Sequence, residues 1–217
     1  MSSADKLTDL QHRVLDALDG FEPPFVLTGG GALAGVHLRH RGTRDLDLFW
    51  RHHEKLNDLP DRVIEHLTAH GLSVSTLRSA PAFVELRVAD EHSSVVVDLV
   101  ADASYAADPP QSHRVGNATI LVDSPREILA NKLCTLLGRA EIRDLIDVEA
   151  LLASGADLET ALADAPSKDG GFSPLTLAWV LRSVDVPHLA RTVGLDEKEG
   201  ARLDAFRQSL IERLISV

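Results

Sequence analysis

The strongest structural signal in the chain is the sequence Phe25-Val26-Leu27-Thr28-Gly29-Gly30-Gly31-Ala32-Leu33-Ala34. An apolar run precedes three glycines, and small helix-favouring residues follow them, which predicts a strand, a glycine turn and a helix. Glycines at such a turn let the backbone approach a polyphosphate, and the free N–H groups of the helix start attract anions. The Lys-Ser/Thr pair of a P-loop is absent. The candidate phosphate-binding residues are therefore Thr28, Gly29, Gly30 and Gly31.

Two carboxylates lie on the next predicted strand. Asp45 and Asp47 are two positions apart, so both side chains project from one face, with Cα atoms about 6.5–7 Å apart. Like charges at this distance favour a bound cation, and Mg²⁺ is bound by carboxylates together with substrate phosphates. The alternative is a solvated acidic strand face.

A third acid, Asp98, lies inside the apolar run from Val95 to Val100. An ionised carboxylate in such a run is costly unless it is paired, liganded or at a strand end. Asp45, Asp47 and Asp98 together predict a site for one or two Mg²⁺ ions beside the glycine turn. A salt bridge from Asp98 to Arg87 or Arg44 is the competing interpretation.

The remaining pattern predicts two modules. Helices are expected near Leu7–Leu18 and at residues 58–70, strands at about 72–77, 83–88 and 95–100, and a hairpin around Gly116-Asn117. From Ser124-Pro125 onward the pattern is helical. We therefore predict an α+β fold, with a mixed twisted sheet flanked by helices in residues 1–123 and a helical domain in residues 124–217. Breaks between helices are expected near Gly155, Pro166–Gly171, Pro174, Pro187 and Gly194.

Composition limits the class of protein. The 217 residues are 44% hydrophobic and 25% charged, as in an ordinary globular protein, and the net charge is -11. This acidic balance disfavours a general DNA-coating protein, although four arginines and four histidines gather between His37 and His53. The sequence has no long apolar run or signal-peptide pattern, and its one cysteine, Cys134, forms no internal disulfide. We therefore expect a cytoplasmic protein without a membrane partner.

The order of these motifs resembles the DNA polymerase β-like nucleotidyltransferase superfamily, and within it the AbiEii/AbiGii toxin family with the related MenT-type toxins. The resemblance covers about residues 20–155. One departure is Gly-Gly-Gly where the family often has Gly-Gly-Thr or Gly-Ser. The matching residues are the stretch Leu27–Ala34, Arg44-Asp45-Leu46-Asp47-Leu48-Phe49, Lys132-Leu133 and Arg143-Asp144-Leu145-Ile146-Asp147.

The resemblance implies a polymerase β-like core and transfer of a nucleoside monophosphate from an NTP to an acceptor hydroxyl. Several relatives resemble toxins that modify tRNA and that an antitoxin holds in check, so the resemblance implies tRNA as a possible acceptor and a cognate antitoxin as a possible partner. Asp45, Asp47 and Asp98 are then Mg²⁺ ligands, with Asp98 also helping to activate the acceptor. Arg44 and Lys132 contact phosphate, and Asp147 orients Lys132 or contacts a substrate. Without the resemblance, Lys132 reads as a solvated helix residue and Arg143 with Asp147 as a weak surface pair.

Two other functions fit parts of the sequence. Gly29-x-Gly31-x-x-Ala34 matches a dinucleotide-binding Rossmann fingerprint, and an acid follows after about 20 residues. The position of Asp45 and Asp47 at the start of their strand disfavours this, because the ribose-binding acid belongs at the far end. The second alternative is a non-catalytic binding subunit that retains the nucleotidyltransferase fold.

Overall fold

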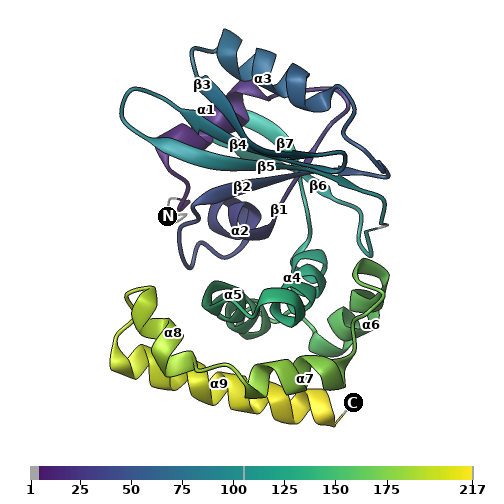
Figure 1. Ribbon diagram of the computed structural model, residues 1–217, viewed down its shortest axis with the longest axis vertical. Helices are drawn as coiled ribbons and strands as arrows, with labels where there is room; N and C mark the ends of the chain where they lie inside the picture. The colour runs from purple at the N-terminus through teal and green to yellow at the C-terminus, as the bar shows by residue number, and fades with distance from the viewer. Residues whose placement is uncertain (1–4, 105, 217) are drawn as a thin grey trace. The chain divides into compact units, whose positions relative to one another are not determined.

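The computed structural model describes residues 5–104 and 106–216, and the chain divides into two compact units (Figure 1). The first unit ends at Ser124 and the second begins at Pro125. The first unit is a mixed sheet with helices, and the second is helical. The mixed α+β architecture expected from the sequence is therefore confirmed.

The sheet of the first unit has the strand order β3-β4-β5-β2-β1-β7-β6 among the residues described. The pairs β1–β7 and β2–β5 are parallel, and the other neighbours are antiparallel. The strands are β1 (Val26–Thr28), β2 (Asp45–Arg51), β3 (Ser73–Ala80), β4 (Phe83–Ala89), β5 (Ser94–Asp102), β6 (Gln111–Val115) and β7 (Ala118–Val122).

One face of this sheet forms the core. Helices α1 (Asp9–Ala17) and α3 (Leu59–Ala69) lie on the same side of it (Figure 1). Along β2, buried Leu46, Leu48 and Trp50 alternate with half-exposed residues. The Trp50 ring meets the Phe21 ring edge-on at 6.0 Å. Since each such large apolar side chain stabilises the fold by about 1.5–3 kcal/mol on burial, this alternation fixes which face of β2 is turned away from the core.

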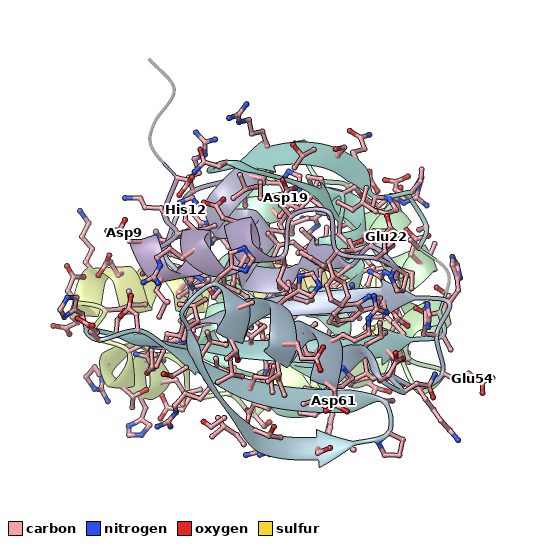
Figure 2. The ribbon with its side chains drawn as sticks, turned by 90° about the horizontal axis from the view of Figure 1, so that it is seen from above. Asp9, His12, Asp19, Glu22, Glu54 and Asp61 are labelled. Carbon is pink, nitrogen blue, oxygen red and sulfur yellow. The ribbon has the colours of Figure 1, made fainter. Side chains whose placement is uncertain are left out.

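Helix α1 is joined to the β6–β7 hairpin by its acidic side chains. The Asp16 carboxylate accepts hydrogen bonds from the backbone N–H groups of Asn117 and Ala118, at 3.1 Å each. Asp19 accepts one from the Thr119 N–H at 3.0 Å. Figure 2 shows His12 on this helix and Asp19 just after its end, seen from above. These bonds fix α1 against the edge of the sheet.

The glycine stretch differs from its expected form. Gly29–Ala32 is itself a short helix, α2, and Leu33–His37 continues it as a π-helical turn, η1. No separate turn is needed, because Gly29 has a φ of +57° and redirects the chain from strand to helix in one residue. Gly30 and Gly31 are thus helical residues.

The second unit consists of α4 (Pro125–Arg139), α5 (Ile142–Ala153), α6 (Leu158–Lys168), α7 (Pro174–Arg182), α8 (Val186–Thr192) and α9 (Glu197–Ile215) within the described chain. The break expected at Pro166–Gly171 is confirmed, since α6 ends at Lys168 and α7 begins at Pro174, although Pro166 itself lies inside α6. The helix ends two residues later, so the proline removes a hydrogen bond only from its last turn. None of the helices in residues 5–104 and 106–216 is long and apolar enough to span a membrane.

Candidate functional site

The three predicted metal-binding acids lie on one face of the sheet. In the parallel β2–β5 pair, Asp47 is the register partner of Asp98. Side chains of directly paired residues share a face, and Asp45 shares it with Asp47 because it lies two positions away. All three acids are partly exposed, on the face opposite Leu46 and Leu48. The sequence had suggested a fully buried strand around Asp98, but β5 is buried on only one face, and Asp98 belongs to the other.

A fourth acid, Glu85, extends this row. It is the register partner of Asp98 on β4, so carboxylates flank Asp98 on both sides. Like charges directly opposite one another destabilise a sheet, which favours a cation at this face. The Arg78 Nε atom lies 3.5 Å from a Glu85 carboxylate oxygen and neutralises part of this charge. We had not predicted Glu85, although its position between Val84 and Leu86 resembles that of the other acids.

Thr43 holds Asp45 in place. Its hydroxyl donates a hydrogen bond to Asp45 Oδ1 at 2.6 Å. The Thr43 carbonyl accepts a hydrogen bond from Gln11 Nε2 at 3.2 Å, and Gln11 is buried in α1. This chain of contacts fixes one oxygen of Asp45 and leaves the other for a ligand. Thr43 was missed because its role depends on a side-chain hydrogen bond that no sequence spacing reveals.

The glycine helix packs directly on the acidic strand. A Cβ atom on Gly29 would lie 2.3 Å from Asp47 Oδ2, and one on Gly30 would lie 2.6 Å from Thr43 Oγ1. The Arg41 guanidinium lies 3.8 Å from that same Cβ position. These positions therefore need glycine for close approach. The structure brings Gly29, Gly30 and Asp47 together, as expected, and adds Arg41.

Thr28 and Arg44 differ in their surroundings. Thr28 is 3% exposed and is the register partner of Asp47 on β1. Its hydroxyl oxygen is buried and has no hydrogen-bond partner among residues 5–104 and 106–216. Such an orphaned group beside a carboxylate fits a site that a polar ligand completes. Arg44 precedes β2 and is exposed.

The donor set fits a hard cation that takes further ligands from a substrate. Within the described part of the chain, no three Asp, Glu, His or Cys side chains form a metal site by themselves. Mg²⁺ is ordinarily held by one or two carboxylates, with phosphate oxygens and waters as its remaining ligands. Asp45, Asp47 and Asp98 on one face, beside an orphaned hydroxyl and a glycine cradle, meet that requirement.

The basic cluster around this site is smaller than the sequence suggested. The Arg51 side chain is only 7% exposed and binds the carboxylates of Asp102 and Asp123, the latter at 2.5 Å. His37 Nε2 is hydrogen-bonded to the Asp123 carbonyl at 2.7 Å. Burial lowers the pKa of His37, against the opposing effect of this bond, and His113 lowers it further. Arg51 and His37 therefore stabilise the fold and are not phosphate ligands.

In the second unit, Lys132 is held by two carboxylates. Its Nζ atom lies 2.7 Å from Asp144 Oδ1 and 2.9 Å from Asp147 Oδ2, and all three residues are buried. Burial lowers the pKa of Lys132, but the charges of Asp147 and Asp144 outweigh it and raise the pKa above its ordinary value of 10.5. Lys132 is thus neither solvated nor neutral, and the proposed surface pair of Arg143 with Asp147 is wrong because Asp147 is fully buried. Asp144 had been given no separate role.

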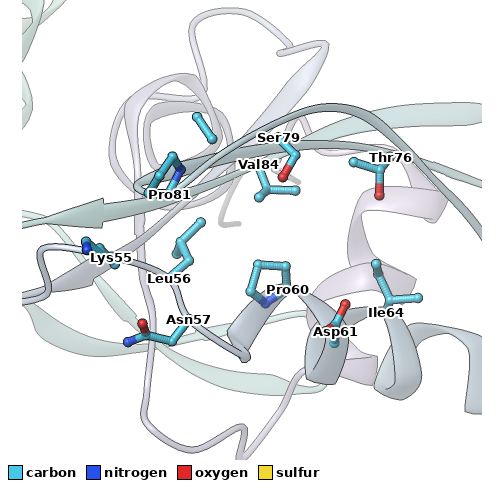
Figure 3. A pocket seen from close by; sticks show the side chains of 11 residues that line it. Lys55, Leu56, Asn57, Pro60, Asp61, Ile64, Thr76, Ser79, Pro81 and Val84 are labelled. Atoms are coloured by element: carbon cyan, nitrogen blue, oxygen red, sulfur yellow. The ribbon is translucent and has the colours of Figure 1, made fainter.

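A cavity of about 540 Å³ lies elsewhere in the first unit, between α3 and the β3–β4 hairpin (Figure 3). Its walls carry Asp61 and Ile64 from α3, Thr76 and Ser79 from β3, and Val84 from β4. None of the predicted site residues lines it. The acidic face of β2 and β5 is therefore a separate feature from this cavity.

The sheet topology excludes the Rossmann alternative. In a Rossmann unit, the strands before and after the glycine-rich helix are parallel. Here β1 and β2, which flank α2 in the chain, are antiparallel. The fingerprint Gly29-x-Gly31-x-x-Ala34 is thus coincidental.

Comparisons with known proteins agree with this topology. Residues 13–212 match the family described as nucleotidyl transferase AbiEii toxin, type IV toxin–antitoxin system. A search of curated proteins finds no significant match.

Solved structures with the same fold include MenT4, a nucleotidyltransferase toxin of Mycobacterium tuberculosis H37Rv. It is 18% identical over 95% of this chain and 90% of its own, with a TM-score of 0.64. JHP933 from Helicobacter pylori is 20% identical over 95% and 91%, with a TM-score of 0.52. The antibiotic-resistance factor ANT(2'')-Ia is 15% identical over 73% and 88%, also with a TM-score of 0.52. At these identities the likeness concerns the fold.

Proposed function

Because this chain belongs to the AbiEii nucleotidyltransferase toxin family, we propose that it transfers a nucleoside monophosphate from an NTP to an acceptor hydroxyl, with release of pyrophosphate, in the presence of Mg²⁺. The observation that carries the proposal is the register of Asp47 with Asp98, together with the contact of Gly29 against the Asp47 carboxylate. The acids that would bind the metal ion therefore lie next to the glycines that would admit the phosphates.

Asp45, Asp47 and Asp98 are the residues that would hold Mg²⁺. When bound, the ion neutralises phosphate charge and makes the acceptor hydroxyl easier to deprotonate. Thr43 keeps Asp45 in one orientation through its 2.6 Å hydrogen bond. Gly29, Gly30 and Gly31 admit the triphosphate, the Thr28 hydroxyl donates to it, and Arg44 supplies a positive charge. Asp98, the partner of Asp47, also serves to accept the proton of the acceptor.

We assign Lys132 and Asp147 supporting roles in the same reaction. An ammonium group has three donors, and Asp144 and Asp147 occupy two of those on Lys132. One N–H is left for a phosphate oxygen, and the raised pKa keeps the group cationic at neutral pH. Asp147 orients the lysine. Lys132 then neutralises charge that develops on the leaving pyrophosphate.

The proposal extends to the acceptor, the partner and the place of action. We propose tRNA as the acceptor, an antitoxin as the inhibitory partner and the cytoplasm as the site of action. Family membership supports the antitoxin, because the family is described as part of a toxin–antitoxin system. Arg41 beside Gly30, and exposed Arg44, support an anionic acceptor because they place positive charge next to the acids of an otherwise acidic chain.

The proposed function is tested by exchanging Asp47. Labelled NTPs are added one at a time to the purified protein with Mg²⁺ and a tRNA pool, and label is followed into nucleic acid and protein. Asp47→Asn should lower transfer at least about a hundredfold, because it removes a charged metal ligand. Asp61→Asn, on α3 beside the separate cavity, is the control and should match the unmodified chain.

Unchanged transfer by Asp47→Asn, with unchanged thermal unfolding, would refute the metal assignment. Absence of transfer by the unmodified chain with every NTP, despite NTP binding, would favour the alternative of a non-catalytic binding subunit.

A further inference from the structure

Asp144 is as closely bound to Lys132 as Asp147 is. It lies one helical turn before Asp147 on α5, so both carboxylates are on the same face of that helix. Asp144 is 1% exposed, and its Oδ1 atom accepts a hydrogen bond from Lys132 Nζ at 2.7 Å, against 2.9 Å for Asp147. A buried carboxylate without a cationic partner strongly destabilises the fold, so the role of Asp144 is inferred from the cations that it contacts.

Asp144 is also bound from its other side. Arg139 Nε lies 3.0 Å from Asp144 Oδ2, and the Arg139 side chain is 54% exposed. Two cations, Lys132 and Arg139, therefore contact the Asp144 carboxylate, and Arg139 Nε also lies 3.6 Å from Glu141 Oε1. The shorter of the two arginine contacts is to Oδ2, the oxygen that the lysine does not use.

Two anchors restrict the ammonium group far more than one does. A lysine ammonium on its flexible four-carbon stem rotates about any single hydrogen bond. When two of its three donors are directed at carboxylates on successive turns of a rigid helix, the direction of the third N–H is fixed. Ordering a long side chain before the substrate binds removes an entropic cost from the binding step.

We propose that Asp144 is a positioning residue: with Asp147 it holds the Lys132 ammonium in one orientation, which orders the remaining N–H before a phosphate binds to it. This inference rests on the proposed function, since it gives Lys132 a phosphate to contact. Asp144 itself touches no reacting atom.

The test compares two neutralised carboxylates of the same unit. Asp144→Asn keeps the shape and loses the charge. Glu127→Gln is the matched control, because Glu127 is also fully buried. Its carboxylate forms a buried ion pair with Lys168, which joins α4 to α6. Both variants should lose stability. Asp144→Asn should also lower kcat about ten- to a hundredfold per folded molecule, with a smaller change in the KM for NTP, and should move the alkaline limb of the pH profile to lower pH. Glu127→Gln should keep kcat and the pH profile.

A second readout does not depend on activity. The Lys132 ammonium ¹H–¹⁵N signal, identified by its loss in Lys132→Arg, should exchange slowly with water in the unmodified chain and in Glu127→Gln. It should exchange faster in Asp144→Asn. If Asp144→Asn does not fold, Asp144→Glu replaces it, because it keeps the charge and displaces the carboxylate.

The outcomes separate the two proposals. Transfer by the unmodified chain with equal kcat, equal pH profile and equal ammonium exchange in Asp144→Asn and Glu127→Gln would overturn the role of Asp144. Faster ammonium exchange in Asp144→Asn, in a chain that transfers no nucleotide, would support the positioning geometry and overturn the proposed function instead.

Discussion

Gly29 is the residue at which backbone conformation and site chemistry constrain each other most closely. Its φ of +57° is unfavourable for other residues, and its Cβ position lies 2.3 Å from Asp47 Oδ2. We predict that Gly29→Ala costs about 1–2 kcal/mol of unfolding free energy through backbone strain and also displaces the Asp47 carboxylate, which abolishes nucleotide transfer. Urea unfolding and the labelled-NTP assay measure the two effects.

Gly71→Ala separates strain from displacement. Gly71 has a φ of +77° and nothing within 4 Å of its Cβ position. This variant should lose similar stability and retain transfer. Equal activity in the two variants would show that the approach of Gly29 to Asp47 has no functional role.

The site residues that could be predicted from sequence are those set by strand alternation and local spacing. Asp45 and Asp47 share a face whenever their segment is a strand, so their relation needs no tertiary information. Asp98 required the register of two strands about 50 positions apart, and its place among the metal-binding acids was inferred only from its apolar surroundings. Thr43, Glu85 and Asp144 act through contacts that depend on side-chain direction or on register, and the sequence does not specify these.

At the scale of elements, the π-helical turn η1 is fixed by His37 to the end of β7. The His37 Nε2 atom is hydrogen-bonded to the Asp123 carbonyl. The centroid of the His37 ring lies 5.8 Å from that of His113. Burial lowers the pKa of His37 from 6.5. As the pH falls below 6.5, the unfolded chain binds a proton that the folded chain resists, so this group's contribution to stability is present above 6.5 and lost as pH falls through the lowered folded value.

We predict that His37→Gln weakens the loss of stability between pH 7.5 and pH 5.5, because glutamine can still donate to the carbonyl but does not titrate. The change is at most about 1.4 kcal/mol per pH unit. Urea midpoints at the two pH values measure it, with His92→Gln, on an exposed turn, as the control. The same pH slope in all three proteins would contradict the assignment.

Element boundaries show where local signals suffice. The strands at 83–89 and 94–102 follow from β-branched residues in alternation, and the structure has them within one or two residues of the prediction. The glycine helix was misread because three glycines indicate a turn by propensity, whereas the left-handed Gly29 makes the turn alone and packing against β2 keeps Gly30 and Gly31 helical. The break expected at Pro166–Gly171 is present after Lys168, and Pro166 is tolerated in the last turn of α6 because a proline near a helix end costs little.

At the scale of the whole molecule, the pairing of β1 with β2 separates this fold from a dinucleotide-binding fold that has the same glycine pattern. The two strands are antiparallel, and β2 therefore begins where β1 ends. This places Asp47 beside Thr28 and next to Gly29, so the acids and the phosphate-admitting turn meet where β1 ends, in the middle of the sheet. The position of Asp45 and Asp47 at the start of their predicted strand already disfavoured a dinucleotide-binding fold. The antiparallel register of β1 and β2 explains why the acids lie there.

Ligand binding to the folded chain should report this arrangement through global stability. We predict that NTP with Mg²⁺ raises the midpoint of thermal unfolding. At a ligand concentration one hundred times Kd, the free energy of unfolding should rise by about 2.7 kcal/mol. Asp47→Asn should lose this gain, because Asp47 lies on the acidic face. Asp61→Asn should keep it, because Asp61 lies on α3, beside the separate cavity. The measurement is calorimetric unfolding with each NTP, with and without Mg²⁺. A gain that NAD produces and NTP does not would contradict the assignment, since the acids would then have no part in binding. An equal gain without Mg²⁺ would mean that the glycines and nearby cations bind the nucleotide without the carboxylates.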